Sequence, residues 1–332
     1  MELLQVLEPE ECPEKSKWYA LVPCGQSPSS RVGHTCLYLP AAKDNGKGRI
    51  VIIGGANPNG SFSDAYIIDL DSHEWDIPDW EGLLPRYEHA SFIPASNSDN
   101  IWVFGGANQS GNRNCLQLLN LEMGTWQSPS VTGTPPSPRT FHTSSAAIGD
   151  KLYVFGGGDK GPDPVEDTQL HVFDSDDMKW EKLKVKGDVP SGCAAHSAVA
   201  FGKHIYIFGG MDISGALNTM HKYDIEKQSW TQLKYDSPLP PARLDHSMCI
   251  IPWRVCTELK NRNFVNSGDD NKLEENLEGK AVSKREDLHQ RKKDEEGSSE
   301  ERDIQLCLIF GGMDTNGEIY SDCNITIIDD HF

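Results

Sequence analysis

The chain has 332 residues, 37% of them hydrophobic, which is enough to bury a large core in one big domain or two ordinary ones. Acidic residues outnumber basic residues 50 to 31, and the net charge of −19 argues against nucleic acid or an anionic membrane as a partner. The segment from Met1 to Lys17 carries five glutamates, with no apolar run suited to a signal peptide or a membrane span. The composition therefore favours a soluble cytoplasmic protein. Nine cysteines without a C-x-x-C pair are typical of reduced thiols rather than a disulfide framework.

Two adjacent glycines follow a short apolar run five times along the chain. The intervals between the second glycines are 51, 51, 53 and 102, and the last interval spans two periods. A period near 50 with this glycine pair is the pattern of kelch repeats. The pairs are Gly54 and Gly55, Gly105 and Gly106, Gly156 and Gly157, Gly209 and Gly210, and Gly311 and Gly312.

Other residues recur in phase with the glycines. A tryptophan follows the second glycine at one constant spacing at Trp75, Trp126 and Trp230, and slightly later at Trp180, with an Asp or Asn shortly before it in each case. A Pro-rich turn then leads to the sequence R-x-x-H, in which Cys193 replaces one arginine. Asx residues favour turns, so each repeat reads as four short strands separated by turns. The arginines are Arg31, Arg86, Arg139 and Arg243, and the histidines are His34, His89, His142, His196 and His246.

This pattern predicts an all-β kelch-type β-propeller of five four-stranded blades. A small twisted sheet cannot hide both faces alone, so each blade must stack on its neighbours. We expect the glycines to lie where no side chain fits, and the tryptophans to fill the wedges between blades.

The two ends of the chain are expected to close the ring together. The last repeat stops at Phe332, before its tryptophan strand, whereas Trp18 precedes Arg31 by the same spacing that separates Trp126 from Arg139. The strand containing Trp18 is therefore predicted to complete the fifth blade. This gives a flexible tail over residues 1–17 and a propeller over residues 18–332.

One charged segment interrupts the last repeat. The stretch between His246 and Gly311 is several times longer than its counterparts in the other repeats, and the excess, residues 257–303, is rich in Glu, Lys, Asp, Asn and Ser. Such a composition cannot offset the entropy of ordering, so we predict a disordered insertion between the first and second strands of the fifth blade.

Catalytic and cofactor motifs are weak or absent. A G-x-G-x-x-G match at Gly156, Gly158 and Gly161 is followed by prolines instead of a helix, and no P-loop or G-x-S-x-G sequence occurs. Symmetry would bring the five histidines around the channel, where imidazoles can bind a metal, but a residue present in every blade more often serves the blade. The sequence predicts no enzyme, no metal and no cofactor.

The candidate binding surface lies at one mouth of the channel. The four arginines begin the innermost strands and either grip carboxylates of a partner or pair with acids of neighbouring blades. Exposed loops follow each glycine pair, at residues 57–63, 108–114, 159–167, 212–218 and 314–320, and such loops on a rigid ring often determine binding specificity. The residues singled out with the arginines are Asn57, Asn59, Asn108, Asn112 and Arg113.

Several longer runs resemble a particular kelch family. They include GLLPRYEHASFIP at residues 82–94, IWVFGGANQSGNRNCLQ at 101–117, PSPRTFHTSSAAIG at 136–149, GCAAHSAVA at 192–200 and RLDHSMCIIPW at 243–253. These runs are similar to the Rab effector proteins with kelch motifs, over nearly the whole chain. The resemblance implies an adaptor that binds the GTP form of the late-endosomal GTPase Rab-nine and supports transport from late endosomes to the trans-Golgi network. It also implies recruitment from the cytoplasm to late endosome membranes, with other endosomal proteins as further candidate partners.

The sequence departs from this family at one point. The family has six repeats, and the repeat absent here lies near residues 171–180, where the phase of the pattern stays intact. Five blades that close a ring must each span a wider angle than six would. The alternative function is a substrate-recognition module of a ubiquitin ligase or another protein-interaction scaffold, and a kelch-type enzyme would need a catalytic constellation that the sequence does not offer.

Overall fold

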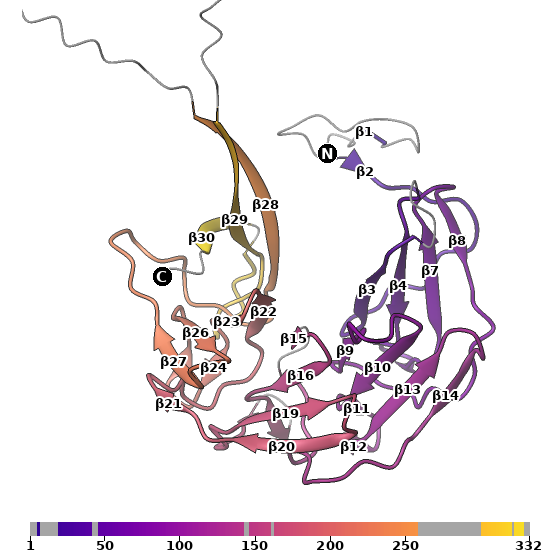
Figure 1. Cartoon of the computed structure of the whole chain (residues 1–332), viewed down its shortest axis with the longest axis horizontal. Helices are drawn as coiled ribbons and strands as arrows, with labels where there is room; N and C mark the ends of the chain where they lie inside the picture. Colours follow the sequence, from indigo (N-terminus) through magenta and orange to yellow (C-terminus); the bar gives the residue numbers. More distant parts are fainter. Residues whose placement is uncertain are drawn as a thin grey trace, which may run out of the picture.

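A computed structural model describes residues 5–6, 19–41, 46–142, 146–160, 163–257, 300–320 and 322–328. Every regular element in these ranges is a β-strand, and the strands form five radial blades arranged as an arc (Figure 1). The predicted all-β, five-bladed kelch architecture is confirmed.

Each of the first three blades is an antiparallel sheet of four strands that follow one another in chain order. Blade 1 consists of β3 (Thr35–Leu39), β4 (Arg49–Ile53), β7 (Ala65–Asp69) and β8 (Glu74–Asp76). Blade 2 consists of β9 (Ala90–Phe92), β10 (Asn100–Phe104), β13 (Leu116–Asn120) and β14 (Thr125–Gln127). Blade 3 consists of β15 (Ala147–Ile148), β16 (Lys151–Val154), β19 (Leu170–Asp174) and β20 (Lys179–Leu183).

In the described residues, blade 4 has one strand more than four and blade 5 has one strand fewer. Blade 4 has β22 (Ser197–Phe201), β23 (His204–Phe208), β26 (Met220–Asp224) and β27 (Ser229–Gln232), and the short β21 (Lys186–Gly187) adds in parallel to its outer edge. Blade 5 has three strands, β28 (Ser247–Thr257), β29 (Glu300–Phe310) and β30 (Cys323–Ile328).

Short hairpins follow the glycine pairs, between the second and third strands of the first four blades. They are β5 (Ala56–Asn57) with β6 (Gly60–Ser61), β11 (Ala107–Asn108) with β12 (Gly111–Asn112), β17 (Gly158–Lys160) with β18 (Asp163–Pro164), and β24 (Met211–Asp212) with β25 (Gly215–Ala216).

A separate hydrophobic core fills each interface between consecutive blades. One buried cluster joins blade 1 to blade 2, a second joins blades 2 and 3, a third joins blades 3 and 4, and a fourth joins blades 4 and 5. The tryptophan of one blade packs on the second strand of the preceding blade: Trp180 lies 4.7 Å from Phe104 and Trp230 lies 5.4 Å from Phe155, centroid to centroid. The predicted wedge role is therefore correct for these two residues and for Trp126, which is buried against blade 1.

The first glycine of a pair lies where two blades approach each other closely, and the second lies against the start of the inner strand of its own blade. A Cβ atom on Gly54 would lie 2.7 Å from the carbonyl oxygen of Arg86 in the next blade, and one on Gly106 would lie 2.5 Å from the carbonyl oxygen of Tyr87 in the same blade. Both glycines also adopt positive φ angles, of 61° and 78°. Only glycine meets both conditions, as the sequence predicted.

The predicted closure of the ring by the N-terminal strand is not what the sheets show. The strand β2 (Tyr19–Ala20) pairs in parallel with β1 (Gln5–Val6), and in the part of the chain that the structure describes no strand pairs with the outer edge of β30. Figure 1 places blades 1 and 5 at the two ends of the arc, with β1 and β2 beside blade 1. Trp18 itself lies outside the described residues, and Gln5–Val6 forms a strand within the predicted tail.

In the ranges given above, contacts that repeat at the other interfaces are not found between blade 5 and blade 1. A Cβ atom on Gly156 would meet the carbonyl oxygen of Cys193 in the next blade at 2.2 Å, whereas one on Gly311 would meet only the Tyr320 carbonyl of its own blade, at 3.6 Å. Backbone hydrogen bonds between blades include Gly55 to Arg86 and Gly210 to Arg243, and within the described ranges none joins blade 5 to blade 1. Among the described residues, the ring is therefore open between blades 5 and 1 (Figure 1).

The charged insertion is narrower than predicted. The strands β28 and β29 pair as a continuous ladder out to Thr257 and Glu300, so Thr257 and residues 300–303 belong to blade 5. The remainder of the predicted disordered segment lies outside the described residues.

Candidate functional site

The four repeat arginines are held inside their own blades. Each donates a hydrogen bond from Nη1 to the carbonyl oxygen of the first glycine of the same blade, at 2.7 to 3.1 Å. Most also meet an acid that follows the glycine pair: Arg31 pairs with Asp64 at 2.6 Å, and Arg243 pairs with Asp322 through both oxygens at 2.8 Å. The arginine therefore ties the start of the inner strand to the hairpin that leaves the second strand.

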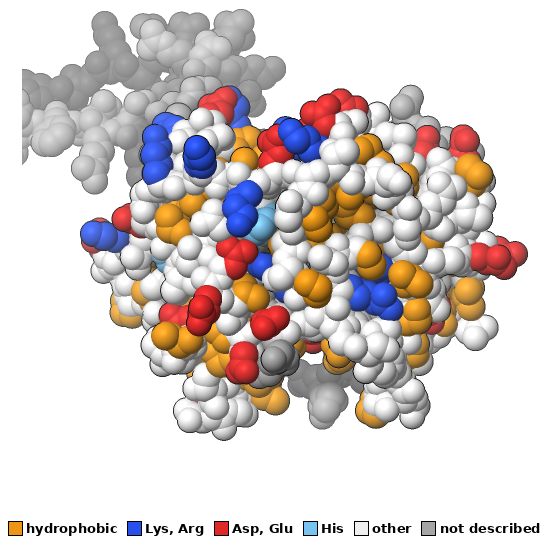
Figure 2. Space-filling view, turned by 90° about the horizontal axis from the view of Figure 1, so that it is seen from below, with side chains coloured by type: hydrophobic (Ala, Val, Ile, Leu, Met, Phe, Trp, Pro, Cys, Tyr) orange, Lys and Arg blue, Asp and Glu red, His pale blue; other side chains and the backbone are white. Residues whose placement is uncertain are grey.

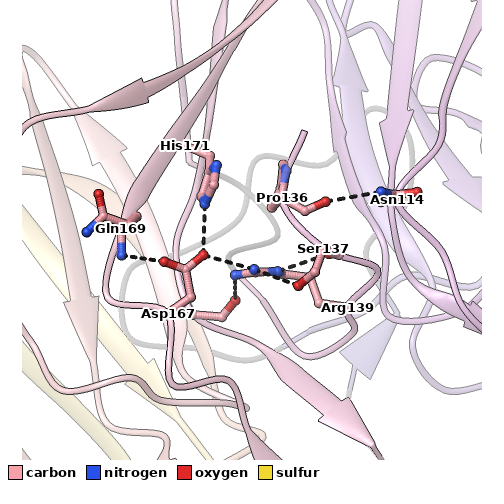
Figure 3. Close-up of polar contacts among 8 residues, drawn as sticks. Asn114, Pro136, Ser137, Arg139, Asp167, Gln169 and His171 are labelled. Carbon is pink, nitrogen blue, oxygen red and sulfur yellow. Dashed lines mark hydrogen bonds and ion pairs between the residues drawn. The ribbon is translucent and has the colours of Figure 1, made fainter. Parts of the chain in front are cut away.

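Figure 3 shows this arrangement in blade 3. Arg139 donates to the Asp167 carboxylate at 3.1 Å and to the Ser137 hydroxyl at 3.0 Å. His171 Nε2 lies 2.9 Å from the same carboxylate oxygen as the arginine, and the backbone N–H of Gln169 donates to the other oxygen at 3.0 Å. These hydrogen bonds and the arginine keep the pKa of Asp167 below its usual value, against the opposing effect of burial. The carboxylate is a fixed, charged structural link.

The expectation that the arginines grip a partner is not met by this geometry. Arg86 and Arg243 are 0% exposed and Arg139 is 1% exposed, and their donors point at carbonyl and side-chain acceptors of the same blade. The alternative, pairing with acids of neighbouring blades, is also wrong, because Asp64, Asp167 and Asp322 belong to the arginine's own blade. The arginines therefore stabilise the blades, and their donor groups are occupied within the blade.

In two blades the arginine–acid pair is replaced by other residues. Blade 2 has Cys115 and Gln117 near the arginine instead of an acid, and Arg86 donates to the Gln117 amide oxygen at 2.7 Å. Blade 4 has no arginine at this point, and Cys193 takes its place, 3.4 Å from Nδ1 of His196. Burial raises the pKa of the Cys193 thiol to about 12, so this residue is an unreactive packing group.

The repeat histidines occupy the interfaces between blades. A Cβ atom on the first glycine of one blade would meet the imidazole of the next: Gly54 faces His89 at 3.2 Å and Gly105 faces His142 at 2.7 Å. Burial, followed by the charge of neighbouring groups, lowers the pKa of His246 to about 4, so this ring is neutral. No group of three or more His, Cys, Asp or Glu side chains is arranged to hold a metal ion within the ranges described above.

The central channel is lined by the five repeat histidines, as the symmetry of the repeats predicts, and by the residues on either side of them. It has a volume of about 810 Å³, and the residue just before each histidine adopts a positive φ, including Glu88, Ala195 and Asp245 at 54°, 57° and 54°. The Glu88 carboxylate accepts a hydrogen bond from the Thr140 hydroxyl of the next blade. Burial, together with the charge of Asp245, raises the pKa of Glu88 to about 7. The channel thus contains a carboxyl group that titrates near neutral pH.

The loops after the glycine pairs form one continuous surface, which we call the hairpin face: β5–β6, β11–β12, β17–β18, β24–β25 and the loop at residues 314–320. Neighbouring hairpins contact each other, since Ser61 donates to Gln109 Oε1 at 2.8 Å and the Asn112 amide donates to the Asp159 carbonyl at 2.8 Å. Four of the turns begin with an Asx residue whose side-chain oxygen accepts the N–H two residues on, at 2.8 to 2.9 Å. The face is therefore a row of preformed turns.

The predicted binding residues on this face have different roles. Asn57 and Asn108 cap their own turns, and Asn112 bridges to the next hairpin, so these side chains are structural. Asn59 is exposed at a hairpin tip. Arg113 is half-buried, and its Nε has no hydrogen-bond partner.

Two exposed isoleucines on the hairpin face were not singled out from the sequence. Ile213 is 96% exposed at the tip of β24–β25, and Ile319 is 80% exposed in the last loop. Both residues fall in the predicted loops. Their exposure could have been inferred from the sequence, because each isoleucine lies in a turn region between polar residues. Most other apolar side chains are dispersed, and Figure 2 shows hydrophobic, acidic and basic side chains interspersed across the side of the molecule that it views.

Comparisons with known proteins agree with the repeat and the fold. The family model of the KLHDC2/KLHL20/DRC7 Kelch-repeats domain matches residues 41–257. A structural neighbour titled "Structure of YjhT" has a TM-score of 0.61 over 95% of this chain and 89% of its own, and at 13% identity it supports the fold alone.

Close relatives extend over the whole chain. "Rab9 effector protein with kelch motifs" of Homo sapiens is 50% identical over 380 residues, covering 99% of this chain and all of the relative. The proteins of the same name from Xenopus laevis and Rattus norvegicus are 50% and 47% identical, with the same coverage. The human alignment is longer than this chain by close to one repeat, since it spans 380 positions against 332 here. This chain belongs to the family of Rab9 effector proteins with kelch motifs.

Proposed function

We propose that the protein is a kelch-repeat adaptor that binds the GTP-bound form of a Rab GTPase and supports vesicle transport from late endosomes to the trans-Golgi network. The observation that carries the proposal is the match to Rab9 effector proteins at 44 to 50% identity over nearly the full length of both chains. The propeller and these relatives indicate a protein-interaction scaffold. The part of the chain that the structure describes contains no helix that could span a bilayer. We assign recruitment to late endosomes to the bound partner.

We place the GTPase on the hairpin face. A surface that distinguishes GTP from GDP must contact the switch segments, which the γ-phosphate orders. The hairpin face offers preformed turns at low entropic cost, together with the exposed apolar side chains of Ile213 and Ile319 in adjacent blades. Central apolar anchors supply most of the affinity in protein interfaces, so these isoleucines are the candidates for that role.

The proposal is tested by pull-down with the Rab GTPase loaded with a non-hydrolysable GTP analogue or with GDP. We expect strong preference for the GTP analogue, and we expect Ile213→Asp to reduce recovery at least about tenfold. Ile77→Asp is the matched control, because Ile77 is an exposed isoleucine (45%) beyond the last strand of blade 1 and away from the hairpin face. Equal recovery in both nucleotide states would rule out the effector function, and equal loss with both variants would rule out the hairpin face.

A further inference from the structure

Among the described residues, blade 5 has three strands, whereas each of the other blades has at least four. Its outermost strand is β30, and in the part of the chain that the structure describes nothing pairs with the outer edge of this strand. Ile325 and Ile327 on β30 are 61% and 49% exposed. An unpaired, apolar strand edge is a template for the addition of another strand.

A cavity lies beside this edge, between blades 4 and 5. It has a volume of about 270 Å³ and is lined by Phe208, Met220, Tyr235, Ile309 and Thr326, among others. Phe208 ends the second strand of blade 4, as Phe104 does in blade 2. In blade 3 the corresponding residue is Phe155, which directly follows the second strand. Those two phenylalanines are covered by the tryptophans of the next blade, Trp180 and Trp230. The cavity is therefore the position of a missing tryptophan.

The strand register identifies where that tryptophan would sit. In blade 4, Trp230 lies opposite Tyr223, which in turn lies opposite Ile205, three residues before Phe208. In blade 5 the residue three before Phe310 is Cys307, and it lies opposite Thr326. A tryptophan on an added strand opposite Thr326 would thus enter the Phe208 cavity.

The sequence near the N-terminus offers a candidate for this strand. Trp18 has the same spacing to Arg31 as Trp126 and Trp230 have to their arginines, and Tyr19–Ala20 after it is extended and paired with β1 on one edge only. Figure 1 shows β2 beside blade 1, at the end of the arc remote from β30. Within one open arc this strand does not reach the edge that it fits.

We propose that the fourth strand of blade 5 is supplied by the Trp18 strand of a second copy of this chain. The free edge of β2 adds antiparallel to β30, and the indole fills the Phe208 cavity, as in an exchange of one element between identical protomers. Two copies that exchange this strand reciprocally form a closed dimer, and one-way exchange forms a chain of copies.

Light scattering coupled to gel filtration tests the proposal on the full chain over a range of concentrations. We expect dimers or longer assemblies for the native chain, and at least about thirtyfold weaker association for Trp18→Ala, as for loss of a hot-spot aromatic anchor. The fold of the variant is checked by far-ultraviolet circular dichroism. A native chain that stays monomeric at high micromolar concentration overturns the proposal.

Directed cross-linking distinguishes a second copy from the same chain. By the register of blade 4, Tyr19 would lie opposite Ile325. A mixture of Tyr19→Cys protein with Ile325→Cys protein should give a disulfide between the two, mapped by mass spectrometry, whereas a mixture of Tyr19→Cys with Ile77→Cys protein should not. A Tyr19→Cys, Ile325→Cys double variant that cross-links as a monomer, with no cross-link in the mixture, would mean that each chain closes on itself and would overturn the proposal.

Discussion

Trp230 and Trp75 occupy the same position in two blades, but of the two, within the described part of the chain, only Trp230 packs against a neighbouring blade. Trp230 is 1% exposed and contacts Phe155 of blade 3 as well as Tyr223 of its own blade. Trp75 is half-buried, and its ring contact is with Tyr66 of its own blade, at 6.3 Å. The open arc therefore predicts different costs for the same substitution at the two positions.

The magnitudes follow from burial. Trp230→Ala empties a fully enclosed site and should cost about 3 to 5 kcal/mol, whereas Trp75→Ala removes a side chain with solvent on its outer side and should cost about 1 kcal/mol. Trp230→Phe keeps most of the buried volume and is the control for the first variant. In a closed ring both tryptophans would be enclosed, and the two costs would be alike.

Urea denaturation followed by far-ultraviolet circular dichroism measures these costs without depending on tryptophan fluorescence. Dilute protein is required, so that association between copies does not cover blade 1. A loss for Trp75→Ala that matches the loss for Trp230→Ala would show that the outer face of blade 1 is covered within the monomer, and the open arc would be refuted.

Two further predictions concern the buried charges. Arg243→Lys cannot reproduce the two hydrogen bonds to Asp322 together with the one to the Gly311 carbonyl, so thermal unfolding should show a loss of about 2 kcal/mol, and Asp322→Asn should lose less than the lysine variant. If Arg243→Lys has no effect, the hydrogen bonds of Arg243 to Asp322 and to the Gly311 carbonyl are not needed for stability. Glu88 is protonated in the folded state up to a pKa of about 7, while the unfolded chain ionises near its ordinary value, so stability falls as pH rises between about 4.5 and 7. Glu88→Gln should remove this loss, which we put at about 2 kcal/mol after allowing for solvent screening, and should match the native chain near pH 4.5. An equal stability difference at pH 5 and pH 8 would contradict the assigned pKa.

The repeat pattern predicted the blades because each repeated residue type meets a steric or packing requirement that recurs in every blade. The glycine pairs are required by backbone approach, as at Gly54 and Gly106, and the phase of Trp126, Trp180 and Trp230 follows from the packing between consecutive blades. These constraints repeat along the chain, so periodicity reveals them.

The arginines and the ring closure were harder to predict for physical reasons. An arginine beside a turn can face solvent or a buried acid, and the useful signal was the acid that ends the loop after the glycine pair, at Asp64, Asp167 and Asp322. Closure depends on the angle between neighbouring blades, which is determined by the packing of four separate cores and not by residue spacing. The phase of Trp18 predicts that its strand fits blade 5, but residue spacing does not determine whether the strand of the same chain reaches that blade.

The open arc also changes how the molecule comes apart. In a closed ring every blade has two neighbours, so loosening one blade breaks two interfaces. Here blades 1 and 5 each keep one interface, and the four cores form a linear series in which stability is the sum of blades and nearest-neighbour contacts. Unfolding can then begin at either end and spread inward one blade at a time, leaving blade 3 as the last to lose its neighbours.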